Sequence, residues 1–309
     1  MIDPNEVFAA GRLLALPTET VYGLAAPIDR PDLIARVFAL KGRPPSNPLI
    51  VHVGSIEQAR ACAADWPDMA ERLADRFWPG PLTLVVPKAD AISEVITAGQ
   101  PTVALRMPNH PLALALLRAS RAPMVAPSAN LFTRLSPTCA ADVASVFSAD
   151  EVEIVDGGRC QVGIESTIVA VDEAKRQLVL LRPGLITRHQ IEAELPMGWQ
   201  LVDSAQEAPV TAPGQMREHY RPGKPLTVRV VPRRAVPGKG HGNDPGRVTL
   251  PDTAEQAAHE LYRRLREADA GPAPRLLIEL PVGYLDDPNW AGVVNRLRKA
   301  AGDWEGPPD

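Results

Sequence analysis

The sequence has little cysteine and no long apolar run. Cys62, Cys139 and Cys160 stand far apart among 309 residues, without the short spacing of a zinc site or the pattern of a disulfide framework. No segment approaches the about 20 apolar residues that cross a bilayer, and the N-terminus lacks the basic-then-apolar pattern of a secretory signal. These absences predict reduced thiols, no protein-bound zinc or haem, no membrane partner and a cytoplasmic location.

Common nucleotide and nucleophile motifs are missing as well. The chain has no Gly-x-x-x-x-Gly-Lys-Ser/Thr phosphate loop, no Gly-x-Ser-x-Gly turn and no His-x-x-x-His spacing. The glycine-rich run 238–242 fails the dinucleotide pattern, which needs a strand before it and a helix after it. A nucleotide would therefore have to be held by scattered side chains and backbone amides.

Charge and proline content narrow the class of protein further. Acidic residues outnumber basic ones by 37 to 33, so the surface as a whole is not built for polyanions, although a local basic pocket is compatible with this balance. The 33 prolines are about twice the average share and are dispersed, which predicts rigid loops. A chain of 309 residues exceeds the usual size of a single core, so we expect two domains.

Apolar spacing predicts short strands interleaved with helices in the first two thirds of the chain. We expect strands over residues 12–16, 49–53, 82–86, 102–105, 124–126, 167–171 and 177–181, the last two forming a hairpin. We expect helices over residues 32–40 with Gly42 as the stop, 56–77 with a break at Pro67, 112–117 and 140–147. This alternation predicts an α/β domain, with an α+β type of twisted sheet, over residues 1–203.

The pattern dissolves near Ser204. Residues 204–225 are rich in proline and glycine and have little apolar periodicity, which is typical of a linker. Beyond it we expect strands over 226–231 and 275–280, helices over 253–268 and 290–301, and a loop over 232–251. One strand-helix-strand-helix run predicts a second, smaller α/β domain over residues 226–309.

The connector from Lys41 to His52 concentrates chemistry between a helical run and a strand-like run. Lys41, Arg43, Asn47 and His52 are separated by three prolines. Two cations, an amide and an imidazole suit an anionic ligand, and proline leaves the loop little entropy to lose when that ligand binds. Taken alone, a solvated basic loop explains the segment equally well.

Eight further runs accompany this connector in a fixed order. They are Pro17–Leu24, Phe77–Thr83, Arg106–Pro111, Ala126–Asn130, Ser136–Thr138, Asp156–Gly158, Gly163–Thr167 and Leu181–Gly184. In that order they resemble the YrdC/Sua5 family of threonylcarbamoyl-AMP synthases, densely over residues 10–222 and more thinly beyond. The resemblance implies a YrdC-like catalytic domain followed by a trimmed Rossmann-like domain.

The resemblance also implies an activity and partners. It implies an L-threonylcarbamoyladenylate synthase, a nucleotidyltransferase that condenses L-threonine, bicarbonate or CO2 and ATP, with pyrophosphate as the second product and Mg²⁺ bridging ATP oxygens. A downstream tRNA threonylcarbamoyl transferase complex would then modify A37 of tRNAs that read ANN codons. The carbamate formed from threonine and CO2 is an anion, and so is ATP. The enzyme must bring these two anions together, which positioning and electrostatic stabilisation can achieve without a covalent nucleophile.

Site residues are carried over from the family motifs position by position. The catalytic positions are Lys41 and Arg43; the threonine positions are Thr20, His52, Arg106, Ala126 and Ser166; the ATP positions are Arg43, Asn47, Thr102, Ser128, Ser136, Arg182 and Tyr220. No metal ligands follow from the resemblance. Tyr220 matches a tyrosine that folds over the nucleotide, so the linker is a candidate lid, and we expect the C-terminal domain to anchor it.

The chain departs from the family pattern at two places. Phe132 and Thr133 stand where a Ser-Gly pair usually follows the Ser128–Asn130 turn. Losing glycine removes easy access to positive φ, so we expect the loop leading to Ser136 to take another path. Ala25 replaces a glycine, which we expect to tighten the first ligand loop.

Two other functions stay open. A non-catalytic tRNA or double-stranded RNA-binding module would use residues 217–239, which hold seven Lys or Arg and one acid, and its binding would weaken steeply with salt. An adenylating relative that acts on another carbamoyl compound, like the YrdC-like domain of hydrogenase maturation proteins, is the other. Nothing in the sequence resembles the zinc-finger and acylphosphatase-like modules of those proteins.

Overall fold

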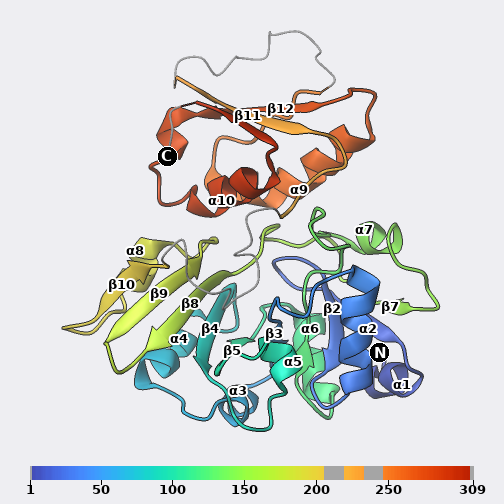
Figure 1. The fold of residues 1–309 in the computed structure, drawn as a ribbon, viewed down its shortest axis with the longest axis vertical. Helices are drawn as coiled ribbons and strands as arrows, with labels where there is room; N and C mark the ends of the chain where they lie inside the picture. The colour runs from blue at the N-terminus through green and yellow to red at the C-terminus, as the bar shows by residue number, and fades with distance from the viewer. Residues whose placement is uncertain (1, 205–218, 233–245, 307–309) are drawn as a thin grey trace.

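Two sheets organise the chain. The computed structural model describes residues 2–204, 219–232 and 246–306 (Figure 1). Within these residues a ten-stranded mixed sheet has the order β10-β9-β8-β4-β5-β3-β6-β2-β1-β7, and a three-stranded sheet has the order β12-β11-β13. The predicted α/β class, with a second and smaller α/β domain, is confirmed.

The strands of the large sheet are mostly short. They are β1 (Leu13–Leu16), β2 (Gly23–Pro27), β3 (Ile50–His52), β4 (Leu82–Pro87), β5 (Thr102–Arg106), β6 (Met124–Val125), β7 (Val152–Ile154), β8 (Thr167–Asp172), β9 (Gln177–Arg182) and β10 (Gln200–Asp203). The hairpin expected over 167–181 is the antiparallel pair β8–β9. Strands β2, β7 and β10 were not predicted.

Helices connect these strands. They are α1 (Pro4–Ala9), α2 (Pro31–Lys41), α3 (Ile56–Cys62), α4 (Asp68–Phe77), α5 (Glu94–Thr97), α6 (Pro111–Ala119), α7 (Ala140–Ala144) and α8 (Arg188–Glu192). Helix α2 ends as predicted at Gly42, which takes a left-handed φ of 60°, and the break expected at Pro67 separates α3 from α4. The helix expected over 140–147 stops early, because the Ser145 hydroxyl bonds back to the Asp142 carbonyl.

The C-terminal domain consists of β11 (Leu226–Val231), α9 (Ala254–Ala270), β12 (Leu276–Pro281), a 3-10 turn (Val282–Tyr284), α10 (Ala291–Ala300) and β13 (Asp303–Glu305). Both outer strands pair in parallel with β11, so the small sheet has one strand more than the sequence pattern predicted. Figure 1 shows α9 and α10 on the face of this sheet that looks toward the large domain.

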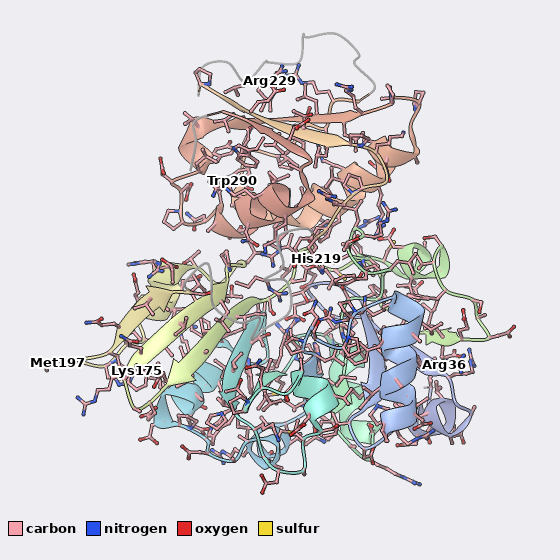
Figure 2. All side chains as sticks on the ribbon, in the orientation of Figure 1. Arg36, Lys175, Met197, His219, Arg229 and Trp290 are labelled. Carbon is pink, nitrogen blue, oxygen red and sulfur yellow. The ribbon has the colours of Figure 1, made fainter. Side chains whose placement is uncertain are left out.

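The two domains share an apolar core. Val21, Leu135, Ile164 and Tyr220 pack into the cluster formed by the C-terminal domain, and Figure 2 shows His219 where the domains meet. In the described part of the chain, no helix combines the length and apolar character that a bilayer crossing requires. The junction therefore places linker residues 219–222 against both domains.

Candidate functional site

One edge of the large sheet gathers chain segments that are far apart in sequence. His52 and Arg106 end the parallel strands β3 and β5 as register partners. Gly23 begins β2 opposite the end of β1, and Ser166 immediately precedes β8. A strand that runs antiparallel to its neighbour begins where that neighbour ends. The last residues of β3 and β5 and the first residues of β2 and β8 therefore lie at the same end of the sheet's strands.

A cavity lies at this edge, and the free space left in it is about 50 Å³, room for about four waters. It is lined by Thr18, Thr20, Val21, Gly23, Arg43, Ile50, His52, Arg106, Ala126, Pro127, Ser128, Glu165, Ser166, Arg182, His219 and Tyr220. Three guanidinium groups thus face one carboxylate, that of Glu165. The electrostatic character of this cavity favours an anion.

Most of the residues expected at the site line this cavity. They are Thr20, Arg43, His52, Arg106, Ala126, Ser128, Ser166, Arg182 and Tyr220. Lys41, Asn47, Thr102 and Ser136 are not among the lining residues. Glu165 and His219 line the cavity but were not predicted as ligand residues, although Glu165 lies in the Gly163–Thr167 run and His219 is next to Tyr220 in the sequence.

The four residues off the wall differ in position. Thr102 begins β5, at the opposite end of that strand from Arg106, roughly 13 Å away by strand geometry. Ser136 lies behind the wall and donates to Glu165 at 2.5 Å. Asn47 is buried in the connector, and its carbonyl accepts from Arg43 Nε at 3.2 Å. Thr102 therefore lies on the same face of β5 as Arg106 but at the other end of the strand.

Lys41 supports the wall from behind. Its ammonium donates to the carbonyls of Ser128 at 2.5 Å and Asn130 at 2.7 Å, and the side chain is buried. Burial, followed by the nearby Arg43 charge, lowers the pKa of Lys41 well below its usual value. Lys41 therefore fixes the Ser128–Asn130 turn against the end of α2 through contacts with backbone carbonyls.

The proline-rich connector wraps around Arg43. The guanidinium donates to the carbonyls of Asn47 and Pro48, at 3.2 and 2.7 Å. Its pKa falls to about 10, mainly because the group is buried and in part because Arg182 lies nearby. Two arginines brought close together in a buried wall are stabilised when an anion binds between them.

Arg182 is tied to the start of β8. Its Nε donates to the Ser166 carbonyl at 3.0 Å, and its Nη2 to the Ser166 hydroxyl at 3.2 Å. The same hydroxyl lies 2.7 Å from that of Thr83. Ser166 and Arg182 thus form one hydrogen-bonded unit at the edge where β8 and β9 pair.

Arg106 is held on the opposite side of the cavity. Its Nη1 donates to the Thr20 hydroxyl at 2.8 Å and its Nε to the Gly80 carbonyl at 3.2 Å. Its Nη2 lies 2.7 Å from Glu19 Oε1, an ion pair whose angles depart from those of a hydrogen bond. These contacts leave further N–H groups of Arg106 available to a ligand carboxylate.

His52 is a neutral imidazole beside Arg106. Burial, helped by the Arg106 charge, lowers its pKa to about 3. Nδ1 of His52 lacks a partner of ordinary hydrogen-bond geometry among the described residues.

The linker closes over the cavity. Tyr220 is buried, lines the cavity and has a φ of 63°, which is uncommon for a residue other than glycine. Its ring lies edge-on to His219, with ring centroids 4.1 Å apart. The His219 amide donates to the Lys299 carbonyl at 3.2 Å, so the C-terminal domain contacts the linker. Residues Pro213–Met216, earlier in the same linker, lie outside the described residues.

The two departures from the family pattern have different outcomes. Thr133 keeps a positive φ of 69°, so the loop retains the left-handed residue that we expected it to lose. The reason is its contacts: the Thr133 carbonyl accepts from Arg221, and the Phe132 amide donates to Lys41, both at 2.7 Å. Ala25 lies in β2 and is buried in the core, so it does not tighten the ligand loop as expected.

Comparison with known proteins defines the class. Residues 6–184 match the model of the Sua5/YciO/YrdC family, described as telomere recombination, and residues 186–302 match a domain described as threonylcarbamoyl-AMP synthase, C-terminal domain. The chain belongs to the Sua5/YciO/YrdC family and carries the C-terminal domain found in part of it.

Proteins that are named as a specific enzyme are similar to this chain over nearly its whole length. The threonylcarbamoyl-AMP synthase of Pyrococcus abyssi is 40% identical over 94% of this chain and 91% of its own length. That of Bacillus subtilis is 39% identical over 97% and 94%. The crystal structure of P. abyssi Sua5 complexed with L-threonine superposes with a TM-score of 0.87 and 37% identity, covering 99% of this chain and 97% of that one.

Proposed function

We propose that this chain is an L-threonylcarbamoyladenylate synthase, a nucleotidyltransferase. It would condense L-threonine, bicarbonate or CO2 and ATP, release pyrophosphate and supply its product to a tRNA threonylcarbamoyl transferase complex for modification of A37. The names of the similar proteins support this proposal, as does the L-threonine complex of P. abyssi Sua5.

One observation carries the proposal. Segments from residue 18 to residue 220 converge on a single cavity whose wall holds Arg43, Arg106 and Arg182 and the one carboxylate of Glu165, while Glu19 pairs with Arg106 from outside the wall. Burying so many cations is unfavourable unless an anion compensates them. A triphosphate beside an amino acid carboxylate supplies that compensation.

The Arg106 side fits the amino acid. The remaining N–H groups of Arg106 would bind the threonine carboxylate, and neutral His52 would accept from or donate to a threonine hydroxyl or amine. Arg106 already has a charged partner in Glu19, so its position is fixed before the ligand arrives. This half of the cavity would hold the threonine nitrogen in place for attack on CO2.

The Arg43 and Arg182 side fits the nucleotide. When the carbamate oxygen attacks the α-phosphorus, a P–O bond forms, the bond to pyrophosphate breaks, and negative charge grows on the phosphoryl oxygens. Two fixed guanidinium groups stabilise that charge without reorganising. Lys41 would act through the Ser128–Asn130 turn that it holds, since the ammonium is engaged with carbonyls of this turn.

The linker must move for this reaction to proceed. The free space of about 50 Å³ is far below the roughly 300 Å³ or more of ordinary ligand pockets. Displacing Tyr220, which lines the cavity, would enlarge it, and its φ of 63° is an uncommon conformation that the surrounding contacts must hold in place. Closing the linker again over the bound nucleotide would exclude water from a hydrolysable mixed anhydride.

The described residues do not form a resident metal site. No group of three or more His, Cys, Asp or Glu side chains comes together in this part of the chain, and the lining carboxylate of Glu165 is engaged with Arg296 at 2.9 Å. Mg²⁺ would therefore enter as Mg-ATP, with the ion carried on phosphate oxygens.

Threonine-dependent pyrophosphate release tests the proposal. The purified chain is incubated with ATP, Mg²⁺, bicarbonate and threonine, and pyrophosphate is measured with and without the amino acid. We expect release that depends on both threonine and bicarbonate. Release that ignores threonine, or none at all, would reject the proposal, and serine and carbamoyl phosphate serve as competing substrates for the hydrogenase-maturation type of reaction.

RNA binding has less support from the described residues. Of segment 217–239, only residues 219–232 are described. Within them Arg229 pairs with Glu305 at 2.6 Å and Lys224 donates to the Gly271 carbonyl at 2.5 Å. These cations already have partners within the C-terminal domain, so we do not advance a non-catalytic RNA-binding module as the function.

A further inference from the structure

Glu165 joins three chain segments at the back of the cavity. Its carboxylate accepts from the Ser136 hydroxyl at 2.5 Å, from the Tyr262 hydroxyl at 3.0 Å and from Arg296 Nε at 2.9 Å. Burial opposes its ionisation, but Arg296, Arg182 and the Ser136 hydroxyl outweigh burial and hold the pKa at about 2. The group is therefore a buried anion, and two of its three partners belong to the C-terminal domain.

Arg296 grips more than this carboxylate. It is fully buried on α10, its Nη2 donates to the Glu165 carbonyl at 2.9 Å, and its Nη1 donates to the Pro183 carbonyl at 2.5 Å. Glu165 immediately precedes Ser166, and Pro183 immediately follows Arg182. One planar guanidinium thus spans the two backbone segments that carry a pair of cavity residues.

The backbone of α10 packs closely against the chain after β9, next to the Arg296 contacts. Gly292 lies one turn before Arg296, and a Cβ added to it would stand 2.9 Å from the backbone of Gly184. Helix α10 therefore sits directly on the chain that leaves β9. Because the packing leaves no free space here, even a small displacement of α10 would also move Arg182 and Ser166.

The same guanidinium supports the linker. The central carbon of the Arg296 guanidinium lies 5.5 Å from the centroid of the Tyr220 ring, and the centroids of the Tyr220 and Tyr262 rings are 5.9 Å apart. Tyr220 therefore packs on Arg296 and Tyr262 of the C-terminal domain, and Arg296 also contacts the wall of the cavity.

From this geometry we propose that Arg296 is a positioning residue for ATP, contributed by the C-terminal domain. It sets the spacing of Ser166 and Arg182 through Glu165 and Pro183, and it supports the closed position of Tyr220. The proposal rests on the proposed function for its ligand. Of the expected threonine positions, Ser166 lies next to this contact, whereas Arg106 is held by Glu19, Thr20 and Gly80 of the large domain and makes no contact that depends on Arg296.

The test compares Arg296→Gln and Arg296→Lys with Arg298→Gln in the full chain. Arg298 is the matched control: it lies on the same helix two residues on, it is exposed, and its guanidinium stacks 5.4 Å from the Trp304 ring. ATP dissociation constants come from calorimetry, KM values from pyrophosphate release, and circular dichroism confirms that each variant is folded.

We expect Arg296→Gln to raise both the dissociation constant and the KM of ATP about tenfold or more, because Arg182 is then no longer held in place before ATP binds. The KM of threonine should rise less than that of ATP, because Arg106 keeps its own contacts in the large domain. Arg296→Lys, which keeps the charge but loses the fork, should fall between Gln and wild type, and Arg298→Gln should match wild type. A normal ATP constant, or equal losses for both substrates, would overturn the proposal.

A double-variant cycle guards against a merely structural effect. If Arg296 acts through Glu165, the combination Glu165→Gln with Arg296→Gln should weaken ATP binding no more than the larger single change, whereas additive losses would contradict the coupling. The calorimetric constant also separates this proposal from the proposed function. A wild-type chain that binds ATP without releasing pyrophosphate would refute the enzyme assignment and still test Arg296.

Discussion

Two buried ion pairs flank the cavity, and they differ in where their partners come from. Glu19 and Arg106 both belong to the large domain, and each side chain is 4% exposed. Glu165 and Arg296 join the large domain to the C-terminal one across 131 residues of sequence. In the proposed function the first pair would orient threonine, and the second would orient the wall proposed for the nucleotide. On that proposal the amino acid half would depend on contacts within one domain, whereas the nucleotide half would need both.

This difference has an energetic meaning. A buried pair contributes little net stability, but losing one partner leaves an uncompensated charge and is strongly destabilising. Breaking the first pair should therefore affect the large domain and threonine, whereas breaking the second should affect the domain contact and ATP. The predictions below break or sharpen that contrast, beginning with the largest effect.

Arg106→Gln should abolish the amino acid half while sparing the other. Removing one side of a buried charge contact costs several kcal/mol, so we expect kcat/KM for threonine to fall about 100-fold or more. The dissociation constant of ATP, measured by calorimetry, should change less than about threefold. The double variant Glu19→Gln with Arg106→Gln removes both charges and controls for unfolding. An equal loss for ATP would show that the two halves are not separate.

Glu19→Gln should break the same pair from its other side. Arg106 then stays buried without its carboxylate, which costs about 3 kcal/mol of unfolding free energy in a urea titration. The KM of threonine should rise about tenfold, because Arg106 loses one of the contacts that fix it. Asp32→Asn, which breaks an exposed pair with Arg30, is the matched control and should leave stability unchanged. Equal stability of Glu19→Gln and wild type would rule out a structural role for the pair.

Acid should weaken both halves through one histidine each. Burial lowers the pKa of His52 and of His219 to about 3, whereas each titrates near 6.5 when unfolded. Between pH 3 and pH 6.5 the unfolded chain binds more protons, so stability is full above pH 6.5 and is lost as the pH falls. The expected slope is about 1.4 kcal/mol per pH unit for each histidine.

Urea titrations at pH 7, 6 and 5 measure this slope. The variant His52→Gln with His219→Gln should flatten it, and a wild-type slope that matches the double variant would contradict the assignment. Glu165 does not contribute to the slope between pH 5 and pH 7. Its pKa of about 2 is depressed, so its stabilisation is lost only as the pH falls below about 4.5.

The contrast between the two pairs also explains what the sequence could predict. Arg106 and Thr20 each follow a strand that apolar periodicity predicted, so both could be placed at strand ends. The same periodicity predicted α2, β4 and the β8–β9 hairpin. Arg296 gave no such signal: a basic residue on an amphipathic helix is ordinarily solvent-exposed, and only the docking of α10 buries it. Thr102 stays a prediction, since strand direction, which sequence does not reveal, places it at the end of β5 opposite Arg106.

Short elements were another gap in the sequence-based prediction, both strands and the helices α1, α5 and α8. Strands β2, β7, β10 and β13 have three to five residues, too few for an alternating pattern to stand out. β2 also begins at Gly23, inside a motif that we interpreted as a ligand loop. Its pairing with β1 and β6 comes from the surrounding sheet and not from local propensity.

A third and weaker tie between the regions runs through Thr133. Its carbonyl accepts from the linker residue Arg221, and its φ of 69° is unfavourable for a β-branched residue. Thr133→Gly removes that strain while keeping the backbone contact, so we expect the free energy of unfolding to rise by about 1 kcal/mol in urea titrations. Arg176→Gly, at a φ of 53° in the distant β8–β9 turn, is the matched control and should gain less, because arginine is not β-branched. A Thr133→Gly variant less stable than wild type would mean that the threonine side chain itself holds the linker, and that the tie lies in packing and not in the backbone.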